Sequence, residues 1–409
     1  MTAVEFDGLT MRPITAEEFI SWGRATETAF FEEPSDEALE RWREITELDR
    51  TLAVFDGDDI VGTAGTLSYR LTVPGGELRM GGLTAVGVLP THRRRGILRA
   101  MMARQLADVA EAGEPLAGLF AAEAPIYGRY GYGMAAPAVY SKLAATHTRF
   151  HDRVAFERGL GFVDVEEALA TFPAIHDAVR ATRPGMPNRS PQEWRAWLAH
   201  DPEDEREDYS RRQLARLGER GYVIYRGKGS SKQGLPSGTL LVIEHMATDA
   251  VAAASLWRFL FDVDLVDEIE VNARPTDDGL PLLLADPRRL RSWTFDGLWL
   301  RLVHLDAALA GRAYDREGEV VLDVVDELCP WNAGVWRLEV GPGGASCSRT
   351  TAAADVRVPT AGLAAAFLGT VPLARQVRAG AGEECTPGGA RRADLLFATD
   401  PAPWCPQEF

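Results

Sequence analysis

The chain contains little cysteine and little histidine. It has four cysteines and seven histidines in 409 residues. The cysteines are widely spaced, and the sequence contains neither a CxxC pair nor the cysteine and histidine spacing typical of a metal site. We therefore expect no metal cofactor and free thiols in a reducing cytoplasm, with a Cys347–Cys385 or Cys385–Cys405 disulfide as the alternative.

Basic residues are outnumbered by acidic ones. The 44 lysines and arginines and the 60 aspartates and glutamates give a formal net charge of −16 at pH 7. This balance argues against binding to nucleic acid or to an anionic membrane surface. No apolar run is long enough to span a membrane, and the first residues lack the pattern of a signal peptide. We expect a cytoplasmic protein whose acidic surface attracts cationic small molecules or simply keeps it soluble.

One basic segment stands out against this acidic background, namely residues 83–99, LTAVGVLPTHRRRGILR. Val86 and Val88 alternate as in a β-strand, and the apolar residues from Leu98 onwards have helical spacing. A helix that begins after a glycine, here Gly96, presents unpaired N–H groups to an anion. The three adjacent arginines can neutralise a diphosphate, so the segment predicts an anion site; the alternative is a solvated basic turn.

Residues 1–145 alternate between helical and extended patterns. Ser35 can cap a helix that carries acidic residues in its first turn, and glycine-containing turns separate the strands. The expected helices are 16–25, 35–47 and 97–112, and the expected strands are 51–55, 60–69, 78–88 and 115–121.

Residues 146–295 repeat this mixture in a weaker form, which favours an internal duplication. The segment has no basic, glycine-containing turn, so a duplicate here has lost the anion site. The expected helices are 163–182, 190–200 and 249–261, and the expected strands are 222–225, 239–246 and 268–272.

From residue 296 onwards the pattern changes. Residues 298–302, 320–325, 335–340 and 355–358 are predicted to form one antiparallel sheet, followed by helices over 360–368 and 371–379. The chain ends on Phe409, with Trp404 nearby. Most termini fray, but these large aromatic residues favour a C-terminus that packs against the protein.

The basic turn RRRGIL resembles motif A of the GNAT acyl-CoA-dependent N-acetyltransferases, whose pattern is Arg/Gln-x-x-Gly-x-Gly/Ala. Leu98 stands where the superfamily prefers a small residue. The Eis (enhanced intracellular survival) acetyltransferase family carries a bulky residue there, and several further segments are similar to that family. These are VGVLPTHRRRGILRAMM (86–102), IYGRYGYG (Ile126–Gly133), DGLWLRLVHLDAALAGRAY (Asp296–Tyr314) and the terminal Glu408-Phe409.

The resemblance implies a mixed α/β and α+β architecture with three domains. It implies a catalytic GNAT domain over 1–145, a degenerate GNAT-like domain over 146–295, and a sterol-carrier-protein-like domain over 296–409 whose C-terminus returns to the active site. The implied assembly is a homo-hexamer.

The activity implied by the resemblance is acetyl transfer from acetyl-CoA to amines of polycationic small molecules such as aminoglycosides, which confers antibiotic resistance. The alternatives are a protein-lysine or polyamine acetyltransferase that uses the same site, and a non-catalytic regulator that binds acyl-CoA or lipid.

The resemblance also assigns roles to individual residues along the acetyl-CoA. The strand residues pair with the pantetheine, the arginine turn holds the pyrophosphate, and two residues after the next strand line the acetyl end. These sets are Val86, Gly87 and Val88; Arg94, Arg95, Gly96, Ile97, Leu98 and Arg99; and Ala122 and Glu123.

For the chemistry, the resemblance makes Tyr127 the general acid and the α-carboxylate of Phe409 the general base. A phenol can return a proton to a departing thiolate, whereas an α-carboxylate is ordinarily a weak base for an ammonium. From the residues alone, the favoured interpretation of Tyr127 is a buried structural residue near a turn. The substrate contacts are expected from acidic residues, namely Glu32, Glu33, Asp36 and Glu408.

Overall fold

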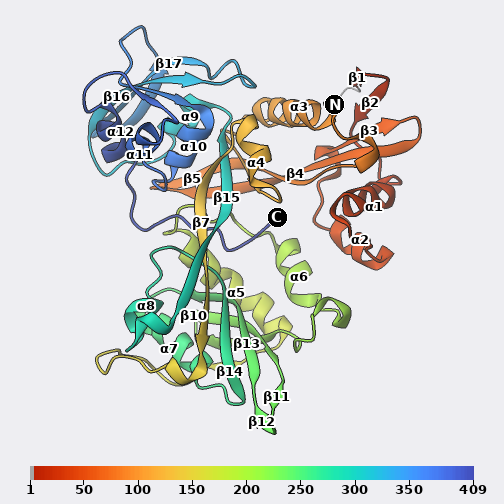
Figure 1. Cartoon of the computed structure of the whole chain (residues 1–409), viewed down its shortest axis with the longest axis vertical. Coiled ribbons are helices and arrows are strands. Elements are labelled where there is room, and N and C mark those ends of the chain that lie inside the picture. Colours follow the sequence, from red (N-terminus) through yellow and green to blue (C-terminus); the bar gives the residue numbers. More distant parts are fainter. Residues whose placement is uncertain (1–3) are drawn as a thin grey trace. The chain divides into compact units, whose positions relative to one another are not determined.

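A computed structural model of the chain describes residues 4–409, and they form two compact units (Figure 1). Of the described residues, unit 1 contains 4–135, 298–400 and 408–409, and unit 2 contains 136–297 and 401–407. The N-terminal and C-terminal thirds of the sequence therefore share one unit, and the middle third forms most of the other.

The first sheet of unit 1 has the strand order β1-β2-β3-β4-β5-β6. Neighbouring strands are antiparallel except β5 and β6, which are parallel. The hairpin and parallel connections agree with the alternation predicted from the sequence. The strands are β1 (Val4–Phe6), β2 (Leu9–Arg12), β3 (Thr51–Asp56), β4 (Asp59–Val73), β5 (Gly76–Val88) and β6 (Leu116–Phe120).

Four helices accompany this sheet: α1 (Phe19–Phe30), α2 (Asp36–Arg43), α3 (Ile97–Glu111) and α4 (Ala124–Tyr127). The predicted cap of α2 is confirmed, because the Ser35 hydroxyl accepts a hydrogen bond from the Ala38 N–H at 3.1 Å. The prediction for α1 was wrong in its bounds. This helix continues past residue 25 and ends where Phe31 adopts a left-handed conformation (φ 65°).

Strand β15 (Arg291–Leu302) corrects one sequence prediction. Its residues Leu298–Leu302 pair antiparallel with Leu116–Phe120 of β6, so they extend the first sheet rather than the C-terminal one. The apolar pattern of this strand suits any buried sheet, and the pairing with β6 is decided by tertiary contacts.

The C-terminal part of unit 1 has its own sheet, with the order β18-β17-β16-β19-β20. The expectation that it is wholly antiparallel was wrong, because β16 and β19 are parallel. The strands are β16 (Gly318–Val325), β17 (Gly334–Gly341), β18 (Gly344–Arg349), β19 (Val356–Pro359) and β20 (Glu383–Glu384). The helices are α9 (Leu305–Ala310), α10 (Thr360–Phe367), α11 (Leu373–Arg378) and α12 (Gly389–Phe397).

Unit 2 contains a sheet with the order β7-β14-β13-β10-β9-β8. Strands β13 and β14 are parallel and are connected through α7, as β5 and β6 are connected through α3. This arrangement agrees with the predicted duplication. The strands are β7 (Gly133–Ala144), β8 (Gly161–Phe162), β9 (Gln213–Leu217), β10 (Gly221–Lys228), β13 (Gly238–Ala247) and β14 (Val266–Arg274), with a separate hairpin of β11 (Ser231–Lys232) and β12 (Leu235–Pro236). The helices are α5 (Val165–Arg180), α6 (Pro191–Ala199), α7 (Ala250–Phe261) and α8 (Leu280–Leu283).

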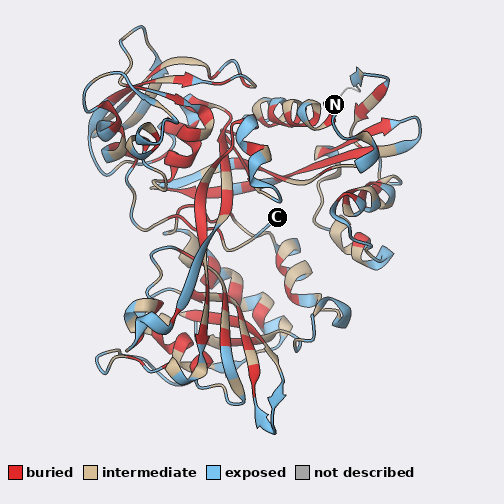
Figure 2. Cartoon of the chain, viewed as in Figure 1, coloured by how far each residue is buried: buried red, intermediate tan, exposed pale blue. Residues whose placement is uncertain are grey.

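Each unit has buried apolar clusters along its strands (Figure 2). In unit 1, Met101 and Met102 of α3 lie in two clusters on the first sheet. In unit 2, Trp257 of α7 and Trp194 of α6 lie in two further clusters on strands that include β10 and β13. Helix α3 is thus held by its apolar side, which leaves its N-terminal end available for a ligand.

We expect Leu300→Ala to test the placement of β15. Leu300 is completely buried, so its truncation should lower the free energy of unfolding by about 2–5 kcal/mol through lost burial and a cavity. Urea unfolding followed by tryptophan fluorescence measures this. Leu395→Ala, on the exposed side of α12 with 45% of Leu395 accessible, is the control and should cost well under half as much. Equal losses would contradict the buried position of β15.

Candidate active site

The parallel strands β5 and β6 separate soon after they begin to pair. Their register covers only Met80–Gly82 with Leu116–Gly118, although β5 continues to Val88. The register between β4 and β5 shifts on the β5 side between Thr84 and Gly87, and Ala85 there has a positive φ of 55°. In the described part of the chain, no strand pairs with the β6-facing edge of Val86–Val88. This edge can hydrogen-bond to an extended, amide-containing ligand.

Helix α3 begins at the end of this edge with an unprotected N-terminus. Gly96 is the N-cap in a left-handed conformation (φ 83°), and no side chain caps the helix. A glycine adopts this conformation at little cost, which explains the residue type. Free N–H groups and the helix dipole are the two features that an anion site of the kind predicted from the sequence requires.

The arginines beside Gly96 are exposed and differ in their contacts. Arg95 pairs with Asp7 at 3.2 Å, and Arg93 donates to the Val88 carbonyl at 3.3 Å. Within residues 4–409, the guanidinium groups of Arg94 and Arg99 have neither a hydrogen bond nor an ion pair. A free β-strand edge, an uncapped helix N-terminus and two available guanidinium groups together fit the pantetheine and diphosphate of an acyl-CoA.

Gly87 is required for a close approach of α1 to β5. A Cβ added at Gly87 would lie 2.9 Å from the Ala29 Cβ and 3.3 Å from the Thr63 hydroxyl. Any larger residue would displace α1 from this edge. The glycine among the predicted pantetheine residues therefore has a packing role as well.

Tyr127 lies at the end of the one-turn helix α4, just beyond β6. Only 7% of the residue is exposed, and its ring contacts the Tyr132 ring edge-on at a centroid distance of 6.3 Å. Burial raises the pKa of Tyr127 to about 12, and the nearby Glu123 and Tyr130 add to the effect. The phenol is therefore protonated at neutral pH and is a weaker acid than an exposed tyrosine.

Ala122 and Glu123 are exposed in the turn between β6 and α4. Glu123 is the N-cap of α4, and its side chain does not cap that helix. Both residues directly precede the segment that carries Tyr127, where an acetyl group would be expected.

The C-terminal residue packs against the first sheet, as its aromatic character suggested. The Phe409 ring lies 4.8 Å from the Tyr69 ring and 5.3 Å from the Phe120 ring, the latter edge-on. A Cβ added at Gly82 would lie 2.9 Å from Phe409 Cε2. Gly82 is the last β5 residue paired with β6, so Phe409 reaches the point where these strands separate. Tyr69 and Phe120 were missed from the sequence, because nothing local relates them to residue 409.

Three of the four acidic residues predicted to contact substrate lie around the connection between α1 and α2, and the fourth, Glu408, precedes Phe409. Glu32, Glu33 and Asp36 are exposed, and Asp36 forms an ion pair with Arg24 at 2.5 Å. Phe31 beside them is 85% exposed.

Glu27 on α1 is a further acidic residue here that the sequence prediction missed, because the predicted helix ended before it. Its pKa is raised by burial and by the carboxylate of Glu32.

Trp42 of α2 packs against the core and not among the acidic residues of the α1–α2 connection. Its ring contacts the Trp22 and Phe19 rings at centroid distances of 5.1 Å and 6.0 Å. His92 lies in the short 3-10 helix Pro90–His92. Its Nε2 lies 3.1 Å from an Asp56 oxygen in the turn before α3.

In unit 2, helix α7 corresponds to α3, but its N-terminus is capped by a side chain. Asp249 caps α7 by accepting a hydrogen bond from the Ala252 N–H, and it pairs with Arg220. The Arg220 hydrogen bond lowers the pKa of Asp249 to about 2, so a fixed negative charge occupies the position of Gly96. A cavity of about 310 Å³ at this end of β13 and β14 is lined by Asp249, Trp257 and Trp404, among others. This arrangement disfavours a diphosphate.

Residues 401–407 belong to unit 2 and are held there by polar contacts. The Trp404 N–H donates to the Pro184 carbonyl, and Arg183 donates to the Ala402 carbonyl. Gln407 accepts from Arg189 at 2.8 Å and donates to Glu193 at 3.1 Å. The two residues that follow, Glu408 and Phe409, belong to unit 1.

The four cysteines are free in the structure. Among the described residues, no group of three or more histidine, cysteine, aspartate or glutamate side chains could hold a metal ion. In the same part of the chain, we find no helix with the length and apolar character needed to cross a membrane.

The separated parallel strands and the glycine entry to α3 define an acyl-CoA-dependent acetyltransferase fold, and the family comparisons agree. Residues 10–135 and 185–302 each match an acetyltransferase (GNAT) domain, and residues 305–406 match a sterol carrier protein domain. The expected fold class of two GNAT domains and a sterol-carrier-like domain is thus confirmed.

Several known proteins are similar to this one over most of its length. An uncharacterised N-acetyltransferase of Streptomyces avermitilis is 40% identical over 381 residues, covering 92% of this chain and 93% of the relative. N-acetyltransferase Eis of Mycobacterium tuberculosis is 36% identical over 386 residues, covering 89% and 90%. The crystal structure of Eis1 from Mycobacterium abscessus has a TM-score of 0.85 at 34% identity, covering 98% of this chain and all of that one. The chain belongs to the Eis family. It is an N-acetyltransferase, and GNAT acetyltransferases use acetyl-CoA as the acetyl donor.

The environment of Tyr127 can be tested by alkaline titration. We expect the phenolate difference spectrum between the wild type and Tyr127→Phe to show one tyrosine with a midpoint near pH 12. Because the folded pKa exceeds the unfolded value, the stability linked to Tyr127 is complete below about pH 10 and is lost as the pH rises towards 12. A midpoint near pH 10 would show that the phenol is solvated and would contradict its burial.

Proposed function

We propose that this enzyme acetylates amines of polycationic small molecules such as aminoglycosides. The observation that carries this proposal is the position of Phe409, whose ring lies where β5 and β6 separate. A chain end held there brings a carboxylate to the opening beside the predicted acetyl-CoA strand. Glu408 beside it is exposed and adds a second negative charge. The net charge of −16 and the exposed Glu32 and Glu33 favour a cationic acceptor over an anionic one.

We assign the contacts to acetyl-CoA, the acetyl donor, to the residues predicted from the sequence. The edge of Val86, Gly87 and Val88 pairs with the pantetheine, and Arg94, Arg95 and Arg99 neutralise the diphosphate. The N–H groups of Gly96, Ile97 and Leu98 face the same phosphates. Ala122 and Glu123 line the acetyl end. The free guanidinium groups of Arg94 and Arg99 and the uncapped N-terminus of α3 support this assignment.

In the proposed reaction, the Phe409 carboxylate accepts a proton from the substrate ammonium, directly or through water. The neutral amine forms the new C–N bond to the acetyl carbon as the C–S bond breaks, and the second proton that the nitrogen loses on becoming an amide passes to solvent. Tyr127 donates its proton to the leaving sulfur and recovers one from solvent. Because burial raises the pKa of Tyr127 above that of a thiol, its proton transfer to the sulfur is uphill, and the reprotonation of the phenolate by solvent completes the step. Each residue thus serves one proton transfer.

We keep the predicted bounds of the three domains, which are 1–145, 146–295 and 296–409. We further propose that the enzyme assembles as a homo-hexamer in the cytoplasm. The alternative acceptor is a protein lysine or a linear polyamine at the same site. The exposed, acidic connection between α1 and α2 supports a cationic acceptor in either case.

An amine panel at two ionic strengths tests the acceptor class. We expect an aminoglycoside such as kanamycin to exceed lysine peptides and anionic amino acids in kcat/KM. This value should fall several-fold between about 0.05 M and about 0.5 M NaCl, because salt screens exposed charges. Thiol release measures the rate. The Glu32→Gln, Glu33→Gln double variant should show a smaller salt effect. An anionic acceptor that outperforms kanamycin would refute the assignment, and a preference for lysine peptides would favour the alternative.

A short Gly-Ser tail appended after Phe409 tests the role of the chain end. We expect it to lower kcat by roughly 100-fold or more, because the carboxylate is displaced from the reacting amine. Calorimetry should show an unchanged affinity for acetyl-CoA. Phe409→Ala keeps the carboxylate and should lower kcat less than the tail does. The remaining loss reflects the missing contacts of the ring with Tyr69 and Phe120, which position the chain end. The same tail at the N-terminus is the control. Full activity of the C-terminally extended enzyme would remove the carboxylate from the mechanism.

A further inference from the structure

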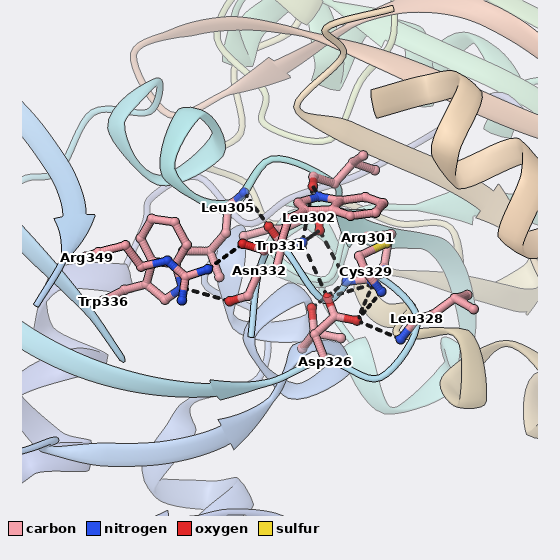
Figure 3. Close-up of polar contacts among 12 residues, drawn as sticks. Arg301, Leu302, Leu305, Asp326, Leu328, Cys329, Trp331, Asn332, Trp336 and Arg349 are labelled. Atoms are coloured by element: carbon pink, nitrogen blue, oxygen red, sulfur yellow. Dashed lines mark hydrogen bonds and ion pairs between the residues drawn. The ribbon is translucent and has the colours of Figure 1, made fainter. Parts of the chain in front are cut away.

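A buried ion pair connects β15 with the C-terminal part of unit 1 (Figure 3). The side chains of Arg301 and Asp326 are 0% and 1% exposed, and Arg301 Nη2 donates to both Asp326 oxygens at 2.7 Å. Arg301 Nη1 donates to the Thr360 hydroxyl at 2.6 Å. Asp326 also accepts hydrogen bonds from the N–H groups of Leu328 and Cys329. Each charge is therefore compensated by its partner and by further hydrogen bonds from the protein.

The loop that follows Asp326 is attached to the end of β15 by two further side chains. Asn332 Nδ2 donates to the carbonyls of Leu302 and Val303 at 3.0 Å and 3.1 Å. Trp331 Nε1 donates to the Val303 carbonyl at 2.8 Å. Figure 3 shows these groups converging on one strand end. Arg301 therefore has little freedom to move.

The other side of Arg301 lies against the segment that follows Tyr127. Gly131 has a φ of 82°, and a Cβ added there would lie 2.7 Å from Arg301 Nε and 2.6 Å from Thr360 Cγ2. Arg301 Nε is buried and has no hydrogen-bond partner among the described residues. A Cβ at Gly133 would lie 2.0 Å from the Ala361 carbonyl oxygen of α10. The glycines of this segment are thus required by the packing of the C-terminal domain against it.

Tyr127 is directly connected to this packed segment. The Tyr132 N–H donates to the Tyr127 carbonyl at 3.2 Å, and the two rings meet edge-on. Val303 and Cys329 belong to the same buried cluster as Tyr127 and Tyr132. Helix α4 is only one turn long, and such a short helix has little stability of its own. The position of Tyr127 therefore depends on what its segment packs against.

We propose that Arg301 and Asp326 are positioning residues for Tyr127. Through this pair, the sterol-carrier-like domain fixes the position of the Tyr127 side chain. This inference rests on the proposed role of Tyr127 as proton donor. Arg301 does not act on the substrate; it fixes Gly131, and Gly131 fixes the turn on which the Tyr127 phenol is held.

A double-mutant cycle tests this inference in the full-length enzyme. The pair is replaced by apolar residues in Arg301→Met, Asp326→Leu, which leaves no unpaired buried charge. We expect kcat to fall roughly 10- to 100-fold, because small displacements of a catalytic group are costly, while the KM for acetyl-CoA stays nearly constant. In a Tyr127→Phe background, itself roughly 10²- to 10⁴-fold slower, the same replacement should have almost no effect on kcat.

The control replaces an exposed pair of the same domain, in Arg337→Gln, Glu319→Gln, and should leave kcat unchanged in both backgrounds. If the apolar pair fails to fold, Gly131→Ala takes its place in the cycle, since its Cβ displaces the turn from the side of Arg301. An unchanged kcat, or equal losses with and without the Tyr127 hydroxyl, would overturn the positioning role. A Tyr127→Phe enzyme with normal turnover would instead refute the proposed acid and, with it, this inference.

Discussion

The proposed active site depends on where the parallel pairing of β5 and β6 ends. Three residue pairs, from Met80–Leu116 to Gly82–Gly118, hold the strands together, and beyond them the edge of β5 is free. That separation exposes the backbone of Val86–Val88 and directs the chain towards the N-terminus of α3. It also leaves the place beside Gly82 in which the Phe409 ring lies. Donor site and chain end thus meet at one break in a sheet.

The two GNAT domains show how one residue at a helix N-terminus changes what a fold can bind. Helix α3 begins after Gly96, whose missing side chain leaves the first N–H groups free. Helix α7 begins after Asp249, which satisfies one of these groups and adds a negative charge. The parallel strands beside α7 pair and connect in the same way. The helix N-terminus is therefore free for a ligand in the first domain and occupied by the Asp249 side chain in the second.

The sterol-carrier-like domain contributes to the catalytic unit through buried polar groups. Asp326 of this domain pairs with Arg301 of β15, and Arg301 lies against Gly131 in the segment that follows Tyr127. A buried ion pair adds little net stability, because desolvation offsets the attraction, but it strongly restricts geometry. The Arg301–Asp326 pair therefore contributes by orienting the segment that carries Tyr127. This gives the third domain a role that does not require it to bind a lipid.

Local chemistry in the sequence determined the helix start at Gly96, the Ser35 cap of α2, the duplication and the basic turn, because these depend on residues close together in the chain. Similarity to a family supplied the roles of Tyr127 and Phe409, which no local pattern indicates. Only the tertiary structure decided that β15 joins the first sheet, that β16 and β19 are parallel, and that Tyr69 and Phe120 hold Phe409. Apolar strands and rings suit many partners equally well, and the choice among them is made by packing over the whole unit.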